Sequence, residues 1–328
     1  MKVYLVQPES GVAQSGGFAY NRAVARALAA LGQGGLRETT RAALPHQPSQ
    51  AGEHRLIDSL FLDEPLKAAE RKALSAQGGA YHLLLHLLPF DDPTASVAQK
   101  DRWRTAIESW LPLVGGVFVT GQNAAQEWTR HFPNGPAPHV ASPAIPIARR
   151  KVPAAGNTLR LVTIGGLCRR KNQRFILDEL RRHRDTDFVW NVIGSLTDDL
   201  AYTAAFRREA ASLGGRVKLH GSVPPEDCDA ILDQADLYVS ASVFESFGIA
   251  NATALARGVP TLAFQVGDLA HWTEPGPGCW LHHVPATAAF ARDLASLLRQ
   301  APPYPVPPRP RLTPTTWTGT AERILAAL

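Results

Sequence analysis

Short apolar runs alternate with segments of helical periodicity along almost the whole chain. In the first half, runs rich in β-branched and leucine residues predict strands near 3–6, 56–60, 82–87 and 117–120. Helical spacing between them is clearest at 20–31 and 103–111. In the second half, similar runs predict strands at 159–164, 188–193, 217–219, 237–240 and 261–264. Because buried parallel strands form continuous apolar runs separated by helices, this pattern indicates α/β units with parallel sheets.

The pattern also divides the chain into two domains. Residues 147–158 combine charge, Pro and Gly without apolar periodicity, as is typical of a linker. We therefore expect α/β domains over 1–150 and 151–328, with the boundary near Lys151. Open α/β sheets bind ligands at the carboxyl ends of their strands, so the predicted site lies in a cleft between the domains.

The end of the second domain carries a separate signal. Residues 301–314 contain seven prolines and cannot form a helix. In the segment that follows, Trp317, Ala321, Ile324 and Leu328 share one helical face. This spacing predicts a C-terminal helix that docks back on the body of the protein.

Composition narrows the class of protein. The 328 residues are 45% hydrophobic, which is enough to bury two cores. No apolar run approaches the roughly 18 residues of a membrane span. The first residues resemble a strand more than a signal peptide, and we therefore expect a cytoplasmic protein.

Charge and cysteine content exclude several functions. The net charge of +5 is shared between the halves, so a nucleic-acid-binding face is not indicated, and a small phosphorylated ligand fits better. The cysteines, Cys168, Cys228 and Cys279, are odd in number and widely spaced. They support neither a disulfide framework nor a metal site, so we expect no bound metal.

The segment 235–264 carries the clearest candidate chemistry. It predicts a strand, a short loop that contains Glu245, and a helix that begins near Gly248. The unpaired backbone N–H groups of Gly248, Ile249 and Ala250 would form an anion site. Glu245 is placed to accept hydrogen bonds from ligand hydroxyls, or else it caps the helix or lies in solvent.

These motifs resemble a known enzyme family. The run 236–260 resembles the retaining GT-B glycosyltransferases of glycosyltransferase family 4, which carry a Glu, then Phe-Gly, then an Ala-rich helix that ends in Gly-x-Pro. Segment 164–172 resembles the loop that presents a Lys to the donor diphosphate, and 217–224 resembles the loop that lines the base pocket. Segment 265–269 resembles the Gly-rich turn that follows the next strand.

The resemblance implies a fold, a reaction and a set of site residues. It implies a GT-B protein of two facing Rossmann-like domains, which holds a nucleotide diphosphate sugar mainly in the second domain. It also implies transfer of the sugar to an acceptor hydroxyl with retention, without a metal or other cofactor. Glu245 would then hold the donor sugar, while Lys171 with Arg169 or Arg170 would stabilise the leaving diphosphate. The other donor-binding positions implied are Gly16, Gly17, Val223, Phe247, Gly248, Ile249, Ala250 and Thr253.

Three positions in the first domain add to this interpretation. Gly16 and Gly17 follow the first strand and begin a helix, where they would let the backbone approach a substrate closely. His86 resembles the family histidine near the reacting centre, although a hydrogen-bonded histidine at a strand end is the alternative. Asp58 ends another strand and is interpreted as a turn or cap residue.

Two residues depart from the family pattern. Thr253 stands where the family has a second Glu that binds the ribose hydroxyls, and Gly166 stands where it has a diphosphate-binding Arg. Two alternatives to a transferase therefore stay open: a nucleotide-sugar-binding subunit without turnover, and a nucleotide-sugar epimerase on the same fold. The acceptor, which can be a sugar, lipid, metabolite or protein, and the oligomeric state are not predicted. A peripheral contact with a membrane stays open.

Overall fold

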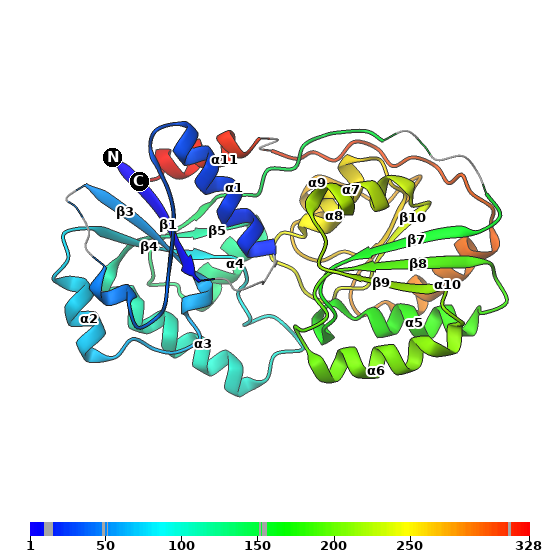
Figure 1. Ribbon diagram of the computed structural model, residues 1–328, viewed down its shortest axis with the longest axis horizontal. Helices are drawn as coiled ribbons and strands as arrows, with labels where there is room; N and C mark the ends of the chain where they lie inside the picture. Colours follow the sequence, from blue (N-terminus) through cyan, green and yellow to red (C-terminus); the bar gives the residue numbers. More distant parts are fainter. Residues whose placement is uncertain (10–15, 48–49, 51, 151, 153–155, 314–315) are drawn as a thin grey trace. The chain divides into compact units, whose positions relative to one another are not determined.

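The computed structural model describes residues 1–9, 16–47, 50, 52–150, 152, 156–313 and 316–328 (Figure 1). The chain forms two compact units: Met1–Ala144 with Thr313–Leu328 is unit 1, and Ile145–Leu312 is unit 2. These units differ from the expected ranges of 1–150 and 151–328, because the C-terminal residues pack with unit 1. Lys151, where we expected the boundary, lies outside the described residues.

Unit 1 contains a parallel sheet with the strand order β2-β1-β3-β4-β5-β6. Its strands are β1 (Lys2–Pro8), β2 (Gly34–Thr39), β3 (Glu53–Asp58), β4 (Ala80–Leu85), β5 (Val114–Val119) and β6 (Pro138–Val140). Its helices are α1 (Gly16–Ala30), α2 (Ala68–Ser75), α3 (Val97–Trp110), α4 (Gln122–His131) and α11 (Trp317–Ala326).

The strands of unit 1 place apolar side chains alternately on two faces of the sheet. Ile57 and Leu83 belong to a core with side chains of α2, α3 and α4. Their neighbours Leu56 and Leu84 belong to a second core with side chains of α1 and α11. Each central strand is therefore buried on both faces, which is why it forms a continuous apolar run.

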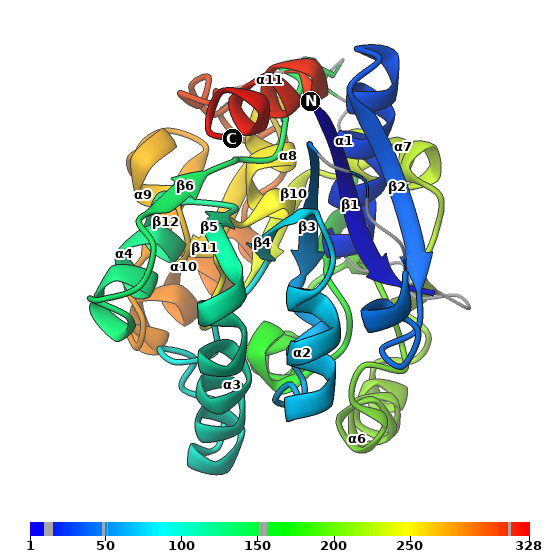
Figure 2. The same cartoon turned by 90° about the vertical axis from the view of Figure 1, so that its left-hand side faces the viewer.

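The C-terminal helix docks on unit 1, as the sequence predicts. Figure 2 shows α11 beside α1, and the two helices contact each other. Ala321 and Ile324 are fully buried in the second core. The Thr320 hydroxyl donates to the Ser142 carbonyl at 2.9 Å. The chain thus leaves unit 1, builds unit 2 and returns.

Unit 2 contains a second parallel sheet, with the order β12-β11-β10-β7-β8-β9. Its strands are β7 (Leu159–Ile164), β8 (Phe188–Ile193), β9 (Val217–Gly221), β10 (Leu237–Ser240), β11 (Thr261–Phe264) and β12 (Cys279–His282). Its helices are α5 (Gln173–Arg182), α6 (Leu200–Ala210), α7 (Pro225–Gln234), α8 (Ile249–Ala256), α9 (Leu269–Trp272) and α10 (Thr287–Arg299).

The sheet of unit 2 is also covered on both faces. Side chains of α5, α6 and α10 pack on one face, and those of α7 and α8 pack on the other. Figure 1 shows helices α5 and α6 below this sheet and helices α7 and α8 above it. Two strands in the middle of this sheet, β7 and β10, carry the loops of the candidate site. Among the described residues, no helix has the length and apolar character needed to span a membrane.

Candidate functional site

Lys171 and Glu245 form an ion pair in unit 2. Lys171 ends a short 3₁₀ turn, Arg169–Lys171, that follows β7, and Glu245 lies in the loop between β10 and α8. The distance from Lys171 Nζ to Glu245 Oε1 is 2.5 Å, and the side chains are only 16% and 12% exposed. Because β7 and β10 are adjacent parallel strands, the loops at their carboxyl ends meet.

Arg170 is the second cation on Glu245. Its Nη1 donates to Glu245 Oε2 at 3.2 Å and to the Phe244 carbonyl at 3.0 Å. Arg169, the other arginine considered from the sequence, is 78% exposed, and its Nε lies 3.9 Å from Asp199 Oδ2. Of the two arginines, Arg170 is therefore the one that accompanies Lys171.

These two cations control the ionisation of Glu245. Burial by itself would raise the pKa of Glu245. The charges of Lys171 and Arg170, with hydrogen bonds from Lys171 and Ser242, outweigh burial and lower the pKa from 4.5 to about 2. The carboxylate is therefore ionised across the physiological pH range, as an acceptor for hydroxyl groups must be.

The start of α8 lies close to Glu245 in the chain. Gly248 caps the helix with φ +94°, a left-handed conformation that favours glycine. The first N–H groups of any α-helix have no intrahelical partner, and no side chain caps this end. Phe247 is buried against the Trp272 ring, at 4.9 Å between ring centroids. Such a helix start favours an anion.

Ser246 was not identified from the sequence. Its side chain is 95% buried, and its hydroxyl has no hydrogen-bond partner among the described residues. It lies between Glu245 and the start of α8. A buried serine is ordinary in a loop, so only the structure shows that this hydroxyl is unsatisfied.

Two glycines bring the loop after β7 close to its neighbours. Gly165 has φ +150°, and a Cβ there would lie 3.0 Å from Lys171 Cε, so the Lys171 side chain passes directly over it. At Gly166 a Cβ would lie 2.0 Å from Asp198 Oδ2. The position where the resemblance implies an arginine therefore faces an aspartate carboxylate in this protein.

Thr253 lies within α8, and Val223 lies in the loop between β9 and α7. The Thr253 hydroxyl donates to the Ile249 carbonyl within the helix, at 2.9 Å. It therefore has no spare proton to donate to a ligand. Val223 and Ala250 are both half-buried and pack against the same small apolar cluster.

In unit 1, Gly17 and His86 are in contact. His86 follows β4, and Gly17 lies in the first turn of α1. A Cβ on Gly17 would lie 3.0 Å from His86 Cδ2, so glycine leaves room for the ring. The Tyr20 ring meets the His86 ring edge-on at 5.1 Å. Gly16 is exposed at the helix start, and Ser15 before it lies outside the described residues.

Asp58 both caps a turn and contacts His86. Its Oδ1 accepts a hydrogen bond from the Leu60 N–H at 2.7 Å, which is the cap role expected from the sequence. Its Oδ2 lies 3.4 Å from His86 Nε2, and the side chain is 1% exposed. Burial would raise the pKa of Asp58, but His86, the Leu60 N–H and Asn21 together lower it.

Gln7 and Asn21 belong to the same hydrogen-bonded cluster as Asp58 and His86. They were not identified from the sequence as candidate site residues. Both are fully buried, Gln7 in β1 and Asn21 in α1. The available signal was an uncharged polar residue at a position where the pattern of each element requires an apolar one.

One further group has the composition of a metal site. Single ligand atoms of Asp91, Glu127 and His131 lie within 4.8 Å of one another. Asp91 is already paired with Arg130 at 2.5 Å and with His131 at 3.0 Å, and its N–H donates to Glu127 at 2.9 Å. These atoms therefore have partners within the protein.

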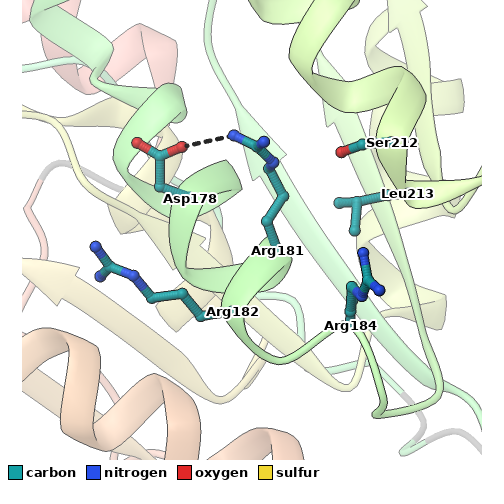
Figure 3. Close-up of a pocket in the computed structure, with 6 residues that line it drawn as sticks. All are labelled: Asp178, Arg181, Arg182, Arg184, Ser212 and Leu213. Carbon is teal, nitrogen blue, oxygen red and sulfur yellow. Dashed lines mark hydrogen bonds and ion pairs between the residues drawn. The ribbon is translucent and has the colours of Figure 1, made fainter.

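A pocket of about 480 Å³ lies at the end of α5 (Figure 3). It contains none of the predicted site residues. Arg181 in this pocket pairs with Asp178 at 3.4 Å, so part of its positive charge is neutralised. The lining residues are Asp178, Arg181, Arg182, Arg184, Ser212 and Leu213.

Comparison with known proteins supports the fold and the resemblance of unit 2. Residues 158–300 match the model of the family described as Glycosyl transferases group 1. None of the curated proteins compared with this sequence matches it.

Several solved structures share the fold over nearly the whole chain. Anabaena Alr3699/HepE in complex with UDP and glucose has a TM-score of 0.70 and 15% identity, and covers 100% of this chain and 94% of its own. The sucrose-phosphate synthase tll1590 from Thermosynechococcus elongatus has a TM-score of 0.70 and 15% identity, and the match covers 99% of this chain and 94% of the synthase chain. A glycosyltransferase from Rickettsia africae ESF-5 has a TM-score of 0.62 and 12% identity, and the match covers 99% of this chain and 93% of that glycosyltransferase chain.

At this level of identity, the solved structures establish the fold alone. The resemblance to the group 1 glycosyltransferases is confirmed over residues 158–300, and the chain has the GT-B fold of two Rossmann-like units.

Proposed function

We propose that this protein transfers a sugar from a nucleotide diphosphate sugar to an acceptor hydroxyl, with retention at the anomeric carbon and without a metal. The observation that carries this proposal is the joint placement of Lys171, Arg170 and Glu245 beside the start of α8. This cluster lies within the segment that matches the group 1 glycosyltransferases. The complexes of Anabaena HepE with UDP and with UDP-glucose favour a uridine nucleotide as the first donor to test.

In this mechanism the protein stabilises charge on the leaving group. Negative charge grows on the diphosphate as the bond to the sugar breaks. Lys171, Arg170 and the N–H groups of residues 248–250 supply fixed positive charge and dipoles for it. The acceptor oxygen forms its bond to the anomeric carbon on the face that the diphosphate leaves, so no protein nucleophile is required. The departing phosphate takes the acceptor proton, so no protein base is required either.

Glu245 has two partners in succession. Without a donor it holds Lys171 and Arg170 through both carboxylate oxygens. When the donor binds, the diphosphate shares these cations, and the carboxylate accepts hydrogen bonds from sugar hydroxyls. The low pKa of Glu245 keeps it in the acceptor form throughout.

The first unit would supply the acceptor side. Gly16 and Gly17 at the start of α1 are assigned to contact with the donor, and His86 after β4 is assigned to orienting the sugar or the acceptor. We also propose that the protein acts in the cytoplasm.

A second candidate function is a nucleotide-sugar-binding subunit that has lost turnover. It is favoured by Gly166, which faces Asp198, and by Thr253, whose hydroxyl proton is used within α8. A nucleotide-sugar epimerase on the same fold is the third alternative, and analysis of the product separates an epimer from a glycoside.

The deciding experiment measures donor turnover in Lys171→Ala and Glu245→Ala, using a panel of nucleotide sugars and acceptors. Loss of one preorganised group should lower kcat by about 10²- to 10³-fold. Lys72→Ala, on the exposed surface of α2, is the matched control and should retain wild-type turnover. Arg169→Ala should have a much smaller effect than Arg170→Ala.

Three outcomes contradict the proposal. Unchanged turnover in both site variants removes the assigned residues from the reaction. Donor binding without transfer or hydrolysis in the wild type supports the binding subunit, and recovery of an epimer supports the isomerase. Because a ligand that binds only the folded protein raises its stability, thermal shifts with nucleoside diphosphates identify the preferred base first.

A further inference from the structure

A chain of hydrogen bonds connects His86 to two carboxylates inside unit 1. His86 Nε2 lies 2.9 Å from Asn21 Oδ1. Asn21 Nδ2 donates to Asp58 Oδ2 and, at 3.1 Å, to Gln7 Oε1. Gln7 Nε2 donates to Glu38 Oε1 at 2.8 Å. Four elements, α1, β1, β2 and β3, and the loop after β4 contribute to this chain, and its two amide side chains are fully buried.

The carboxylates determine the direction of every bond. Ionised Asp58 accepts hydrogen bonds and donates none, so the nitrogen of the Asn21 amide must face it. The Asn21 oxygen then faces His86. At the other end, Glu38 requires the Gln7 nitrogen, which turns the Gln7 oxygen toward Asn21. Both ends therefore give the same orientation of the Asn21 amide.

We infer that Asn21 holds His86 as the tautomer with its proton on Nε2, so that the Nδ1 lone pair accepts a hydrogen bond from a substrate hydroxyl. Both groups that face Nε2, the Asn21 oxygen and the Asp58 carboxylate, are acceptors. No described residue is hydrogen-bonded to Nδ1. The part played by the substrate rests on the proposed function.

Gly17 and Tyr20 complete the orientation of the ring. Gly17 lies beside the edge of the His86 ring that carries Cδ2 and Nε2. A Cβ on Gly17 would lie 3.0 Å from Cδ2 and 3.6 Å from Nε2. Tyr20 packs edge-on against the same ring, and its own hydroxyl donates to the Ala141 carbonyl at 2.8 Å. His86 is 14% exposed, so part of the ring is accessible to a ligand. Asn21 is thus a positioning residue that acts through His86.

The first experiment measures the tautomer directly. Long-range ¹H–¹⁵N NMR of the protein labelled at histidine should show a protonated Nε2 and an unprotonated Nδ1 for His86 at neutral pH. The signal is assigned by its absence in His86→Asn. A proton on Nδ1 instead, or on both nitrogens, overturns the inference. In Asn21→Leu the Asp58 carboxylate still faces Nε2, so the proton should stay on Nε2 while its resonance shifts, because the bond to the Asn21 oxygen is lost.

The second experiment separates the two ring nitrogens kinetically. The asparagine amide occupies the place of Nδ1, and the glutamine amide reaches the place of Nε2. His86→Asn should therefore retain turnover within about tenfold, while His86→Gln, which keeps a contact to Asn21, should lose about 100-fold in kcat. A purely structural role of His86 requires the opposite order. Thermal unfolding of both variants checks that each is folded.

Asn21→Leu tests the positioning role. It should lower kcat and leave the donor KM near the wild-type value, because the donor cations lie in unit 2. An equal change in both parameters would assign Asn21 to donor binding instead. If the wild type shows no turnover with any donor, the proposed function fails, and the NMR experiment still decides the tautomer.

Discussion

At the scale of single residues, the neighbours of a carboxyl group decide whether it is ionised. Glu245 and Glu127 are both largely buried, and burial raises the pKa of each. Lys171 and Arg170 reverse this effect for Glu245 and lower its pKa to about 2. Glu127 is 3% exposed, and burial with the charge of Asp91 raises its pKa to about 8, against the smaller effect of Arg130 and the backbone N–H groups. The same side chain is therefore an anion in one unit and neutral in the other.

The raised pKa of Glu127 predicts a pH dependence of stability. Between its usual pKa of 4.5 and about 8, the folded protein keeps a proton that the unfolded chain releases, so the free energy of unfolding falls as pH rises. Glu127→Gln removes this dependence. Urea denaturation should show the variant gaining stability relative to the wild type from pH 5 to pH 8.

The control for this measurement is Glu108→Gln, at an exposed position of α3. The difference in free energy of unfolding between this variant and the wild type should stay constant from pH 5 to pH 8. If the free energy of unfolding of Glu127→Gln changes with pH in the same way as that of the wild type, the assigned protonation of Glu127 is wrong.

A substitution at Gly17 should change the position of the neighbouring His86 ring. In Gly17→Ala, the new Cβ would lie 3.0 Å from His86 Cδ2, so the ring must shift. Since alanine suits a helix better than glycine, the fold should be retained while donor turnover falls by about tenfold or more. Gly35→Ala, which meets nothing within 4 Å, should change neither stability nor turnover.

At the scale of elements, burial on both faces made the central strands recognisable. Strands β7, β8, β10 and β11 have the bounds expected from their apolar runs. Strands β2, β6 and β12 were not predicted, and each lies at an edge of its sheet. An edge strand has one neighbouring strand and carries more polar residues, as in the Gly-Gly-Leu-Arg-Glu-Thr sequence of β2, so its pattern resembles a loop.

Helix α11 provides a test at this scale. Ile324 is fully buried between α11 and the sheet of unit 1. Ile324→Ala should lower the free energy of unfolding by about 2 to 5 kcal/mol, because it removes buried methyl groups and leaves a cavity. Glu322→Ala, at an exposed position of the same helix, should stay within about 0.5 kcal/mol of the wild type in the same denaturation assay.

At the scale of the whole molecule, both ends of the chain belong to unit 1. Helix α11 covers part of a core that contains strand residues such as Leu5 and Phe118. The described residues that form these cores of unit 2 all belong to unit 2 itself. The stability of the two units therefore depends on different segments of the chain.

Removal of residues 313–328 should accordingly weaken unit 1 selectively. Hydrogen exchange measured by mass spectrometry should become faster in α1 and in β1, where apolar surface is uncovered. Peptides from α5 and α8 should keep their protection. Equal loss of protection in both units would show that the units are coupled through this segment.

The fold and the contiguous part of the candidate site could be predicted from local information. Apolar runs specify buried strands wherever they lie, and the Glu, Phe-Gly and Ala-rich pattern at 245–256 is contiguous in the chain. A loop that begins a helix presents its N–H groups regardless of what packs around it. These features needed no tertiary structure.

The tertiary structure alone decided which side chains meet. His86 and Asn21 are 65 positions apart, and Gln7 and Asp58 join them only because β1 and β3 are adjacent in the sheet. In the same way, packing directs Arg170 to Glu245 and places Asp198 at Gly166. Polar contacts act over a few ångströms in space, while a sequence pattern reports only the preference of each residue for burial, so the partners appear when the sheets form.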